Sequence, residues 1–176
     1  MSTALLVIDV QSALFEVEPA PYEGQEVVER INRLTQWAHQ QGHCVIFIQH
    51  EDAQMGYQTS AWALQHQLIL DSRDHYVRKT TPDSFLGTNL SEILAERDVK
   101  HLIISGYASE FCVDTTVRRA AALGYTVDLA ANAHTTHDKP HASGGQIRQH
   151  HNATLSNIGS FGVKIRALDC DAIITG

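Results

Sequence analysis

Short apolar runs alternate with amphipathic stretches along the chain, and this order limits the possible folds more than any other feature of the sequence. Six runs are rich in β-branched and aliphatic residues: Ala4–Asp9, Cys44–His50, His75–Arg78, His101–Ser105, Thr126–Ala130 and Val163–Ala167. Near-continuous apolar runs of this length are typical of strands that are buried on both faces of a parallel sheet.

The stretches between these runs carry apolar residues at helical spacing. They lie at Gln25–Gln41, Ser91–Arg97, Val113–Leu123 and Gly145–Ile158. The first stretch ends before Gly42, and glycine commonly follows the last turn of a helix. The alternation predicts an α/β fold, a three-layer sandwich with a mostly parallel, Rossmann-like sheet of about six strands and right-handed crossovers.

Length and composition favour a single domain over residues 1–176. The chain has 176 residues, of which 43% are hydrophobic and 19% are charged, and this mixture is typical of globular rather than disordered proteins. A net charge of −7 argues against nucleic-acid binding, and no basic cluster favours an anionic membrane. The sequence shows neither an apolar segment of membrane-spanning length nor a secretory leader, so we expect a cytoplasmic protein.

The cysteines are few and show no pairing pattern. Cys44, Cys112 and Cys170 are far apart in the sequence, and no CxxC spacing occurs. This pattern indicates neither a disulfide framework nor a zinc cluster. The simplest interpretation of each cysteine is a small buried hydrophobic residue.

Polar residues stand at the carboxyl ends of three predicted strands, where open α/β sheets bind ligands. Asp9 ends the first run, Lys79 follows the third, and Cys112 follows the fourth at the expected start of a helix. A helix N-terminus and a nearby lysine both favour a thiolate, and an aspartate can pass a proton to a leaving amine. With backbone N–H groups as an oxyanion hole, this set can hydrolyse an acyl–nitrogen bond through a thioester.

Each of these three residues also has a structural interpretation. A buried aspartate often only accepts hydrogen bonds, a lysine is usually solvated, and an isolated cysteine is usually inert.

Three segments carry a resemblance to a known family. Leu-Leu-Val-Ile-Asp-Val-Gln at 5–11, Arg-Lys-Thr-Thr-Pro-Asp-Ser-Phe at 78–85 and Gly-Tyr-Ala-Ser-Glu-Phe-Cys-Val-Asp-Thr-Thr at 106–116 resemble the isochorismatase-like cysteine hydrolases, which include nicotinamidases. The resemblance runs from about Ala4 to Ile158. It implies a catalytic triad of Asp9, Lys79 and Cys112, and a homo-oligomer that is a dimer or a tetramer.

The resemblance also implies how a substrate is held. It places a cis peptide between Tyr107 and Ala108, which directs the N–H groups of Ala108 and Cys112 at an oxyanion. It implies an apolar slot for a small planar or carbonyl substrate, lined by Leu14, Trp62, Phe85, Tyr107 and Phe111. The alternative for each of these side chains is ordinary core packing.

We expect neither a cofactor nor a metal. Metal-dependent members of this family carry an Asp-x-His pair after the second strand, and Gln49 and His50 do not reproduce it. A meeting of His50 with His66 is the alternative that keeps a metal site open. The other loop histidines are expected to be solvated or hydrogen-bonded, with His137 the one that can line the cleft.

These observations favour a cysteine hydrolase that cleaves a C–N bond of a small amide, carbamoyl or ureido compound through a thioester on Cys112. One alternative is an enol-ether hydrolase of the isochorismatase type, with Asp9 as the acid. The other is a non-catalytic member that binds a small ligand.

Overall fold

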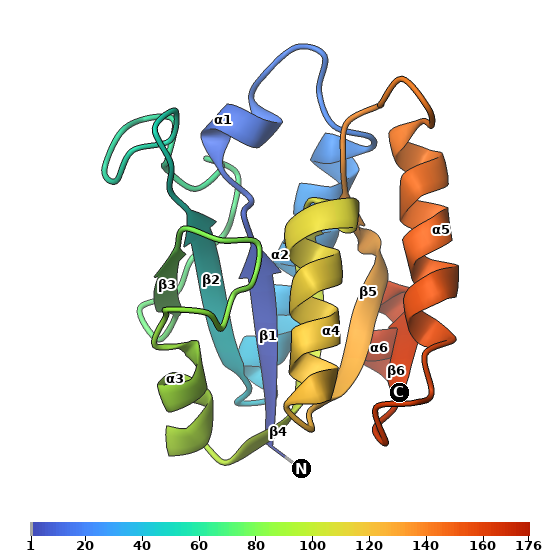
Figure 1. Cartoon of the computed structure of the whole chain (residues 1–176). Coiled ribbons are helices and arrows are strands. Elements are labelled where there is room, and N and C mark those ends of the chain that lie inside the picture. Colours follow the sequence, from blue (N-terminus) through green and yellow to red (C-terminus); the bar gives the residue numbers. More distant parts are fainter. Residues whose placement is uncertain (1) are drawn as a thin grey trace.

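The strands form one parallel sheet in a computed structural model that describes residues 2–176. They are β1 (Ser2–Ile8), β2 (Cys44–His50), β3 (His75–Lys79), β4 (Val99–Tyr107), β5 (Thr126–Thr135) and β6 (Ile165–Leu168). Their order across the sheet is β3-β2-β1-β4-β5-β6, and every neighbouring pair is parallel. The expected sheet of about six strands is therefore confirmed (Figure 1).

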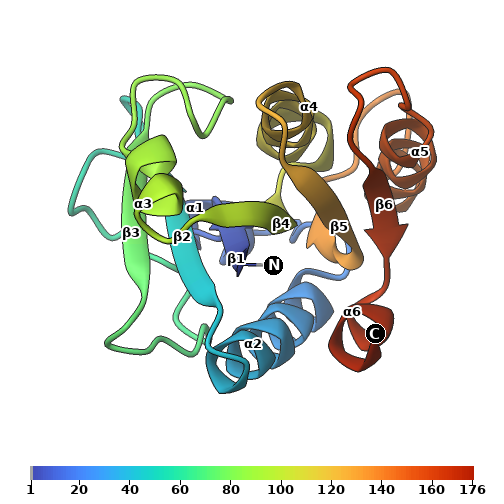
Figure 2. The same cartoon turned by 90° about the horizontal axis from the view of Figure 1, so that it is seen from below.

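Helices cover both faces of the sheet. Figure 2 shows α2 (Gly24–Gln40) and α6 (Cys170–Thr175) on one face, with α3 (Leu90–Glu96), α4 (Asp114–Ala122) and α5 (Gly144–Ser156) on the other. Side chains alternate along β1, so that Leu5 and Val7 pack toward α2 while Leu6 and Ile8 pack toward α3 and α4. The structure is thus the three-layer sandwich that the sequence predicts.

Several elements differ from the sequence prediction. The short helix α1 (Ser12–Phe15) and α6 were not predicted. Strand β5 continues to Thr135 because its pairing with β4 resumes in a shifted register, with Gly106 opposite His134. A π-helical turn, η1 (Ser109–Val113), precedes α4, so Cys112 lies inside this turn rather than at the start of an α-helix.

All the strands run in the same direction, so their carboxyl ends share one edge of the sheet. In Figure 1 these ends point toward α1 and the loops above the sheet. Asp9 follows β1, Lys79 ends β3, and η1 follows β4. Within residues 2–176, no helix has both the length and the apolar character needed to cross a membrane.

Candidate active site

Asp9, Lys79 and Cys112 meet at the carboxyl edge of the sheet. The Lys79 ammonium donates to Asp9 Oδ2 over 2.8 Å and to Cys112 Sγ over 3.2 Å. Asp9 and Lys79 are each only 2% exposed, and Cys112 is partly buried. The three side chains that the sequence placed at strand ends therefore form one connected cluster.

The backbone around Asp9 is held in an unusual conformation. Asp9 has a φ of 51°, in the left-handed region, and its N–H donates to Ile48 O over 2.8 Å. On the other side, Gly106 has a φ of 116°, and a Cβ on it would lie 2.0 Å from Ile8 O. Only glycine lets β4 approach β1 this closely at Ile8, the residue that precedes Asp9.

Burial dominates the electrostatics of the cluster. It raises the pKa of Asp9 above 3.8, although the Lys79 charge opposes the change. Burial and the Asp9 carboxylate raise the pKa of Cys112 to about 12, against the effect of Lys79. Lys79 therefore favours the Cys112 thiolate, as expected, but burial and the Asp9 carboxylate outweigh its effect in the resting site.

One oxygen of Asp9 is left without a partner. Asp9 Oδ2 accepts from Lys79, whereas Oδ1 is buried and has no hydrogen-bond partner among the described residues. The neighbouring Cys112 thiol lowers the pKa of Asp9, against the larger effect of burial. A buried acceptor beside a protonated thiol is the arrangement that general base catalysis requires.

His50 is a further member of the site that sequence reasoning did not assign to it. Its Nδ1 lies 3.3 Å from Lys79 Nζ, since His50 and Lys79 are opposite each other in the β2–β3 register. Gln11 holds the His50 backbone by accepting from its N–H and donating to its carbonyl, both over 2.9 Å. The usable signal in the sequence was the position of His50 at the end of the adjacent strand.

The peptide bond between Tyr107 and Ala108 is cis, as the family resemblance implied. The Ala108 carbonyl accepts from the N–H groups of Phe111 and Val113, which closes the η1 turn behind Cys112. An oxyanion hole formed by the N–H groups of Ala108 and Cys112 stays a prediction.

The residues predicted to line the slot lie in different environments. The Tyr107 ring packs edge-on against Phe15, and its hydroxyl contacts His137 Nδ1 over 2.7 Å. Leu14 packs against the same core cluster as Tyr107. The Trp62 ring packs edge-on against Tyr57.

Phe111 and Phe85 lie at opposite extremes of exposure. Phe111 is 56% exposed, whereas Phe85 is 7% exposed and stacks on Tyr125 in the core beneath α3 and α4. The structure therefore gives Phe85 a packing role and leaves Phe111 at the surface beside the nucleophile turn.

The histidines considered as metal ligands have other neighbours. His66 Nδ1 contacts Glu16 Oε1 over 2.7 Å, and His50 faces Lys79. His134 is buried between Ser109 and Asn152. Over residues 2–176, no three His, Cys, Asp or Glu side chains are grouped so that they can hold a metal ion.

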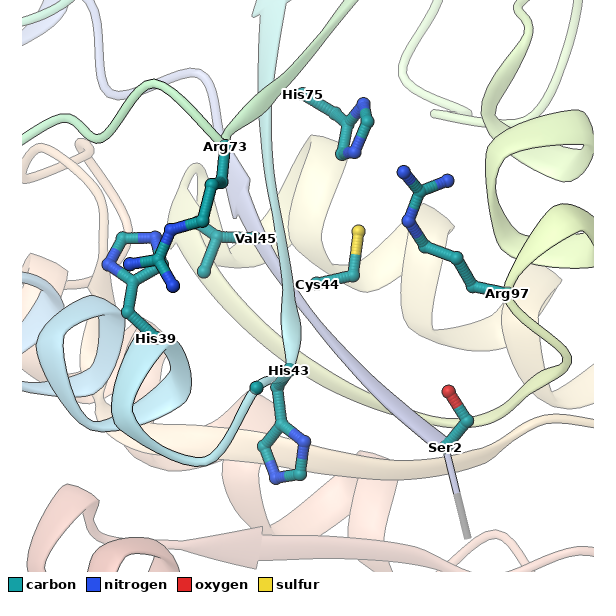
Figure 3. Close-up of a pocket in the computed structure, with 9 residues that line it drawn as sticks. Ser2, His39, His43, Cys44, Val45, Arg73, His75 and Arg97 are labelled. Atoms are coloured by element: carbon teal, nitrogen blue, oxygen red, sulfur yellow. The ribbon is translucent and has the colours of Figure 1, made fainter.

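A separate cavity of about 400 Å³ lies at the opposite edge of the sheet, at the amino ends of β1, β2 and β3. Figure 3 shows Cys44, His75 and Arg97 around it. Burial raises the pKa of Cys44, and Arg73, which also lines the cavity, donates two hydrogen bonds to the Asp71 carboxylate. This cavity lies at the other end of the strands from Cys112, and within residues 2–176 its lining includes no lysine, aspartate or glutamate.

Known proteins resemble the chain over most of its length. A family model described as "Isochorismatase domain" matches residues 3–160. A streptothricin hydrolase of Streptomyces noursei is 37% identical over 142 residues, covering 79% of this chain and 51% of that protein. A ureidoacrylate amidohydrolase of Enterobacter sp. (strain 638) is 30% identical over 64% of this chain and 46% of its own length.

This chain thus spans about half the length of these two relatives. A solved structure, described as an isochorismatase family protein, has a TM-score of 0.87 and 34% identity. It covers 95% of this chain and 98% of its own. The family model and this structural match show that the chain belongs to the isochorismatase family.

Proposed function

We propose that the protein is a cysteine-dependent hydrolase that cleaves a C–N bond of a small amide, carbamoyl or ureido compound. One observation carries the proposal: a buried lysine joins a carboxylate and a thiol, and the second carboxylate oxygen is an unpartnered acceptor. A nucleophile with an adjacent base is the arrangement of covalent acyl-transfer enzymes.

In the first half-reaction, Cys112 Sγ attacks the substrate carbonyl carbon while its proton passes to Asp9. The Lys79 ammonium, which already donates to Sγ, stabilises the negative charge that develops on sulfur. When the tetrahedral intermediate collapses, the C–N bond breaks and Asp9 gives its proton to the leaving nitrogen. The products are a free amine or ammonia and a thioester on Cys112.

In the second half-reaction, Asp9 takes a proton from water as the water oxygen attacks the thioester carbonyl. The C–S bond then breaks, the proton returns to sulfur, and the carboxylic or carbamic acid leaves. The raised pKa of Cys112 suits both halves, because the thiol is the resting form and the thiolate exists only during reaction.

The class of substrate is supported by the names of two relatives. One is a ureidoacrylate amidohydrolase, and the other is a streptothricin hydrolase. The Tyr107 ring lies close enough to Cys112 and Asp9 for both to raise its pKa, and it offers an apolar surface that suits a small uncharged acyl group. Leu14 packs against the same core cluster as Tyr107 and is proposed to extend this surface. We also propose that the protein works on its substrate as a dimer or tetramer, which sedimentation velocity tests.

Two variants separate this mechanism from the alternatives. Cys112→Ala and Asp9→Asn are assayed for ammonia release on a panel of small amides, N-carbamoyl compounds and ureido compounds. Both variants are expected to lose activity by at least about a thousandfold, as loss of a nucleophile or its base does in other covalent enzymes. Ammonia release that survives in Cys112→Ala would refute the thioester mechanism. Cleavage of a small enol ether by Cys112→Ala but not by Asp9→Asn, with no ammonia release from the panel by the unsubstituted protein, would instead support acid catalysis.

A further inference from the structure

We propose that His50 is a positioning residue: its neutral imidazole accepts the third N–H of Lys79 and thereby fixes the ammonium between Asp9 and Cys112. The inference rests on the proposed function, in which Lys79 serves both of those groups. His50 lies outside the Asp–Lys–Cys set and would act on the reaction only through Lys79.

The Lys79 ammonium has one donor more than Asp9 and Cys112 take up. A lysine ammonium has three N–H groups and no acceptor. Around Lys79 Nζ stand Asp9 Oδ2 at 2.8 Å, Cys112 Sγ at 3.2 Å and His50 Nδ1 at 3.3 Å. The Lys79 side chain is buried, so each donor that loses its protein partner is left without a substitute.

The position of His50 is fixed from two sides. Gln11, which is fully buried, binds both backbone polar groups of His50 and also donates to Trp62 O over 2.8 Å. An acceptor at Nδ1 places the imidazole proton on Nε2, and Nε2 faces Asp52 Oδ2 at 3.7 Å. Asp52 is itself held by the N–H groups of Gln54 and Met55, each at 2.8 Å.

Protonation of His50 destroys this arrangement. The imidazolium has no lone pair for Lys79 and places a second cation 3.3 Å from the ammonium. The charged groups that face His50 are Lys79, Asp9, Asp52 and Glu51. Burial and Lys79 lower the pKa of His50 below 6.5, so the imidazole is neutral at pH 7 and loses its acceptor on acidification.

Two substitutions separate the acceptor from the rest of the side chain. In His50→Asn, the amide oxygen can stand near the position of Nδ1, whereas in His50→Gln it reaches the position of Nε2. The reactivity of Cys112 is measured as its rate of alkylation by iodoacetamide from pH 4.5 to pH 8, using mass spectrometry of the cysteine-containing peptides. Cys44 and Cys170 serve as internal references, and thermal unfolding checks that each variant is folded.

We expect His50→Gln to slow alkylation of Cys112 by about tenfold at pH 7.5, since a hydrogen bond to a buried charge is lost. His50→Asn should stay within about threefold of the wild-type rate, and its loss of reactivity in acid should move to lower pH. Equal effects of the two substitutions, or an unchanged acid profile in His50→Asn, would overturn the proposal.

A second measurement does not depend on the reactivity of Cys112. In protein labelled with ¹⁵N at histidine, the ring nitrogen shifts of His50 report its tautomer and its titration. We expect the Nε2–H tautomer at pH 7 and a higher titration midpoint in Lys79→Met, because the neighbouring cation is gone. An Nδ1–H tautomer overturns the positioning role, whereas turnover that persists in Cys112→Ala, together with the expected His50 tautomer, overturns only the proposed hydrolase mechanism.

Discussion

Removing the Lys79 charge provides a quantitative test of the buried cluster. Asp9 and Lys79 are each 2% exposed and are joined by a hydrogen bond of 2.8 Å. Lys79→Met leaves the Asp9 carboxylate without a counter-charge, and breaking a buried pair in this way costs about 3–5 kcal/mol. In a chain of this size, the melting temperature should fall by roughly 6–20 °C.

The loss should depend on pH with a definite sign. Without Lys79, the pKa of Asp9 rises further above its unfolded value of 3.8, so the folded state binds the proton more tightly than the unfolded state. The deficit of Lys79→Met is therefore smallest near pH 4 and grows as pH rises through the folded pKa. In the double variant Asp9→Asn/Lys79→Met, no unpaired charge is buried, so most of the loss should be recovered.

Urea unfolding followed by circular dichroism measures these differences. Lys100→Met is the matched control, because Lys100 is exposed and its ion pair is with the exposed Asp98, so it should leave the urea midpoint nearly unchanged. A loss below about 1 kcal/mol in Lys79→Met, or a double variant no more stable than the single one, would refute the reasoning.

Two further predictions concern the support of the site. Burial lowers the pKa of His134 from 6.5 to about 4, so the stability it contributes is complete above pH 6.5 and is lost as pH falls to about 4. In His134→Gln, the free energy of unfolding should fall by about 3 kcal/mol less between pH 6.5 and pH 4 than it does in the wild type, as measured by urea unfolding at both pH values. The same fall in the variant and the wild type would contradict this. Gly106→Ala forces a Cβ to within 2.0 Å of Ile8 O. It should prevent soluble expression or lower the melting temperature by more than 10 °C, which in a chain of this size corresponds to a loss of stability of about 3 kcal/mol or more. Gly159→Ala meets no atom within 4 Å and should melt within a few degrees of wild type, and equal effects of the two substitutions would refute the close approach of β4 to β1.

The sequence predicts the sheet and the meeting of three side chains well, for a physical reason. Strands such as β1 and β2 are buried on both faces, so they are apolar throughout and easily recognised. Once the sheet is parallel, the carboxyl ends of the strands must share an edge. Asp9, Lys79 and Cys112 are therefore brought close by topology alone.

Features that depend on register and burial were less accessible. His50 meets Lys79 because the two stand opposite each other in β2 and β3, and a shift of one residue would have turned His50 to the other face. The protonated state of Cys112 depends on desolvation, which residue spacing does not report. For Phe85, a slot wall and a core position predict the same residue type, and the structure packs it against Tyr125.

The most direct test of the account is the capture of a covalent intermediate on Cys112. The wild-type protein is mixed with the panel of small amides, N-carbamoyl compounds and ureido compounds, quenched in acid during turnover, digested and examined by mass spectrometry. We expect an acyl or carbamoyl adduct on the Cys112 peptide, none on the Cys44 or Cys170 peptides, and loss of turnover in Cys112→Ala. Turnover that continues in Cys112→Ala, with no adduct on the wild-type peptide, would contradict it.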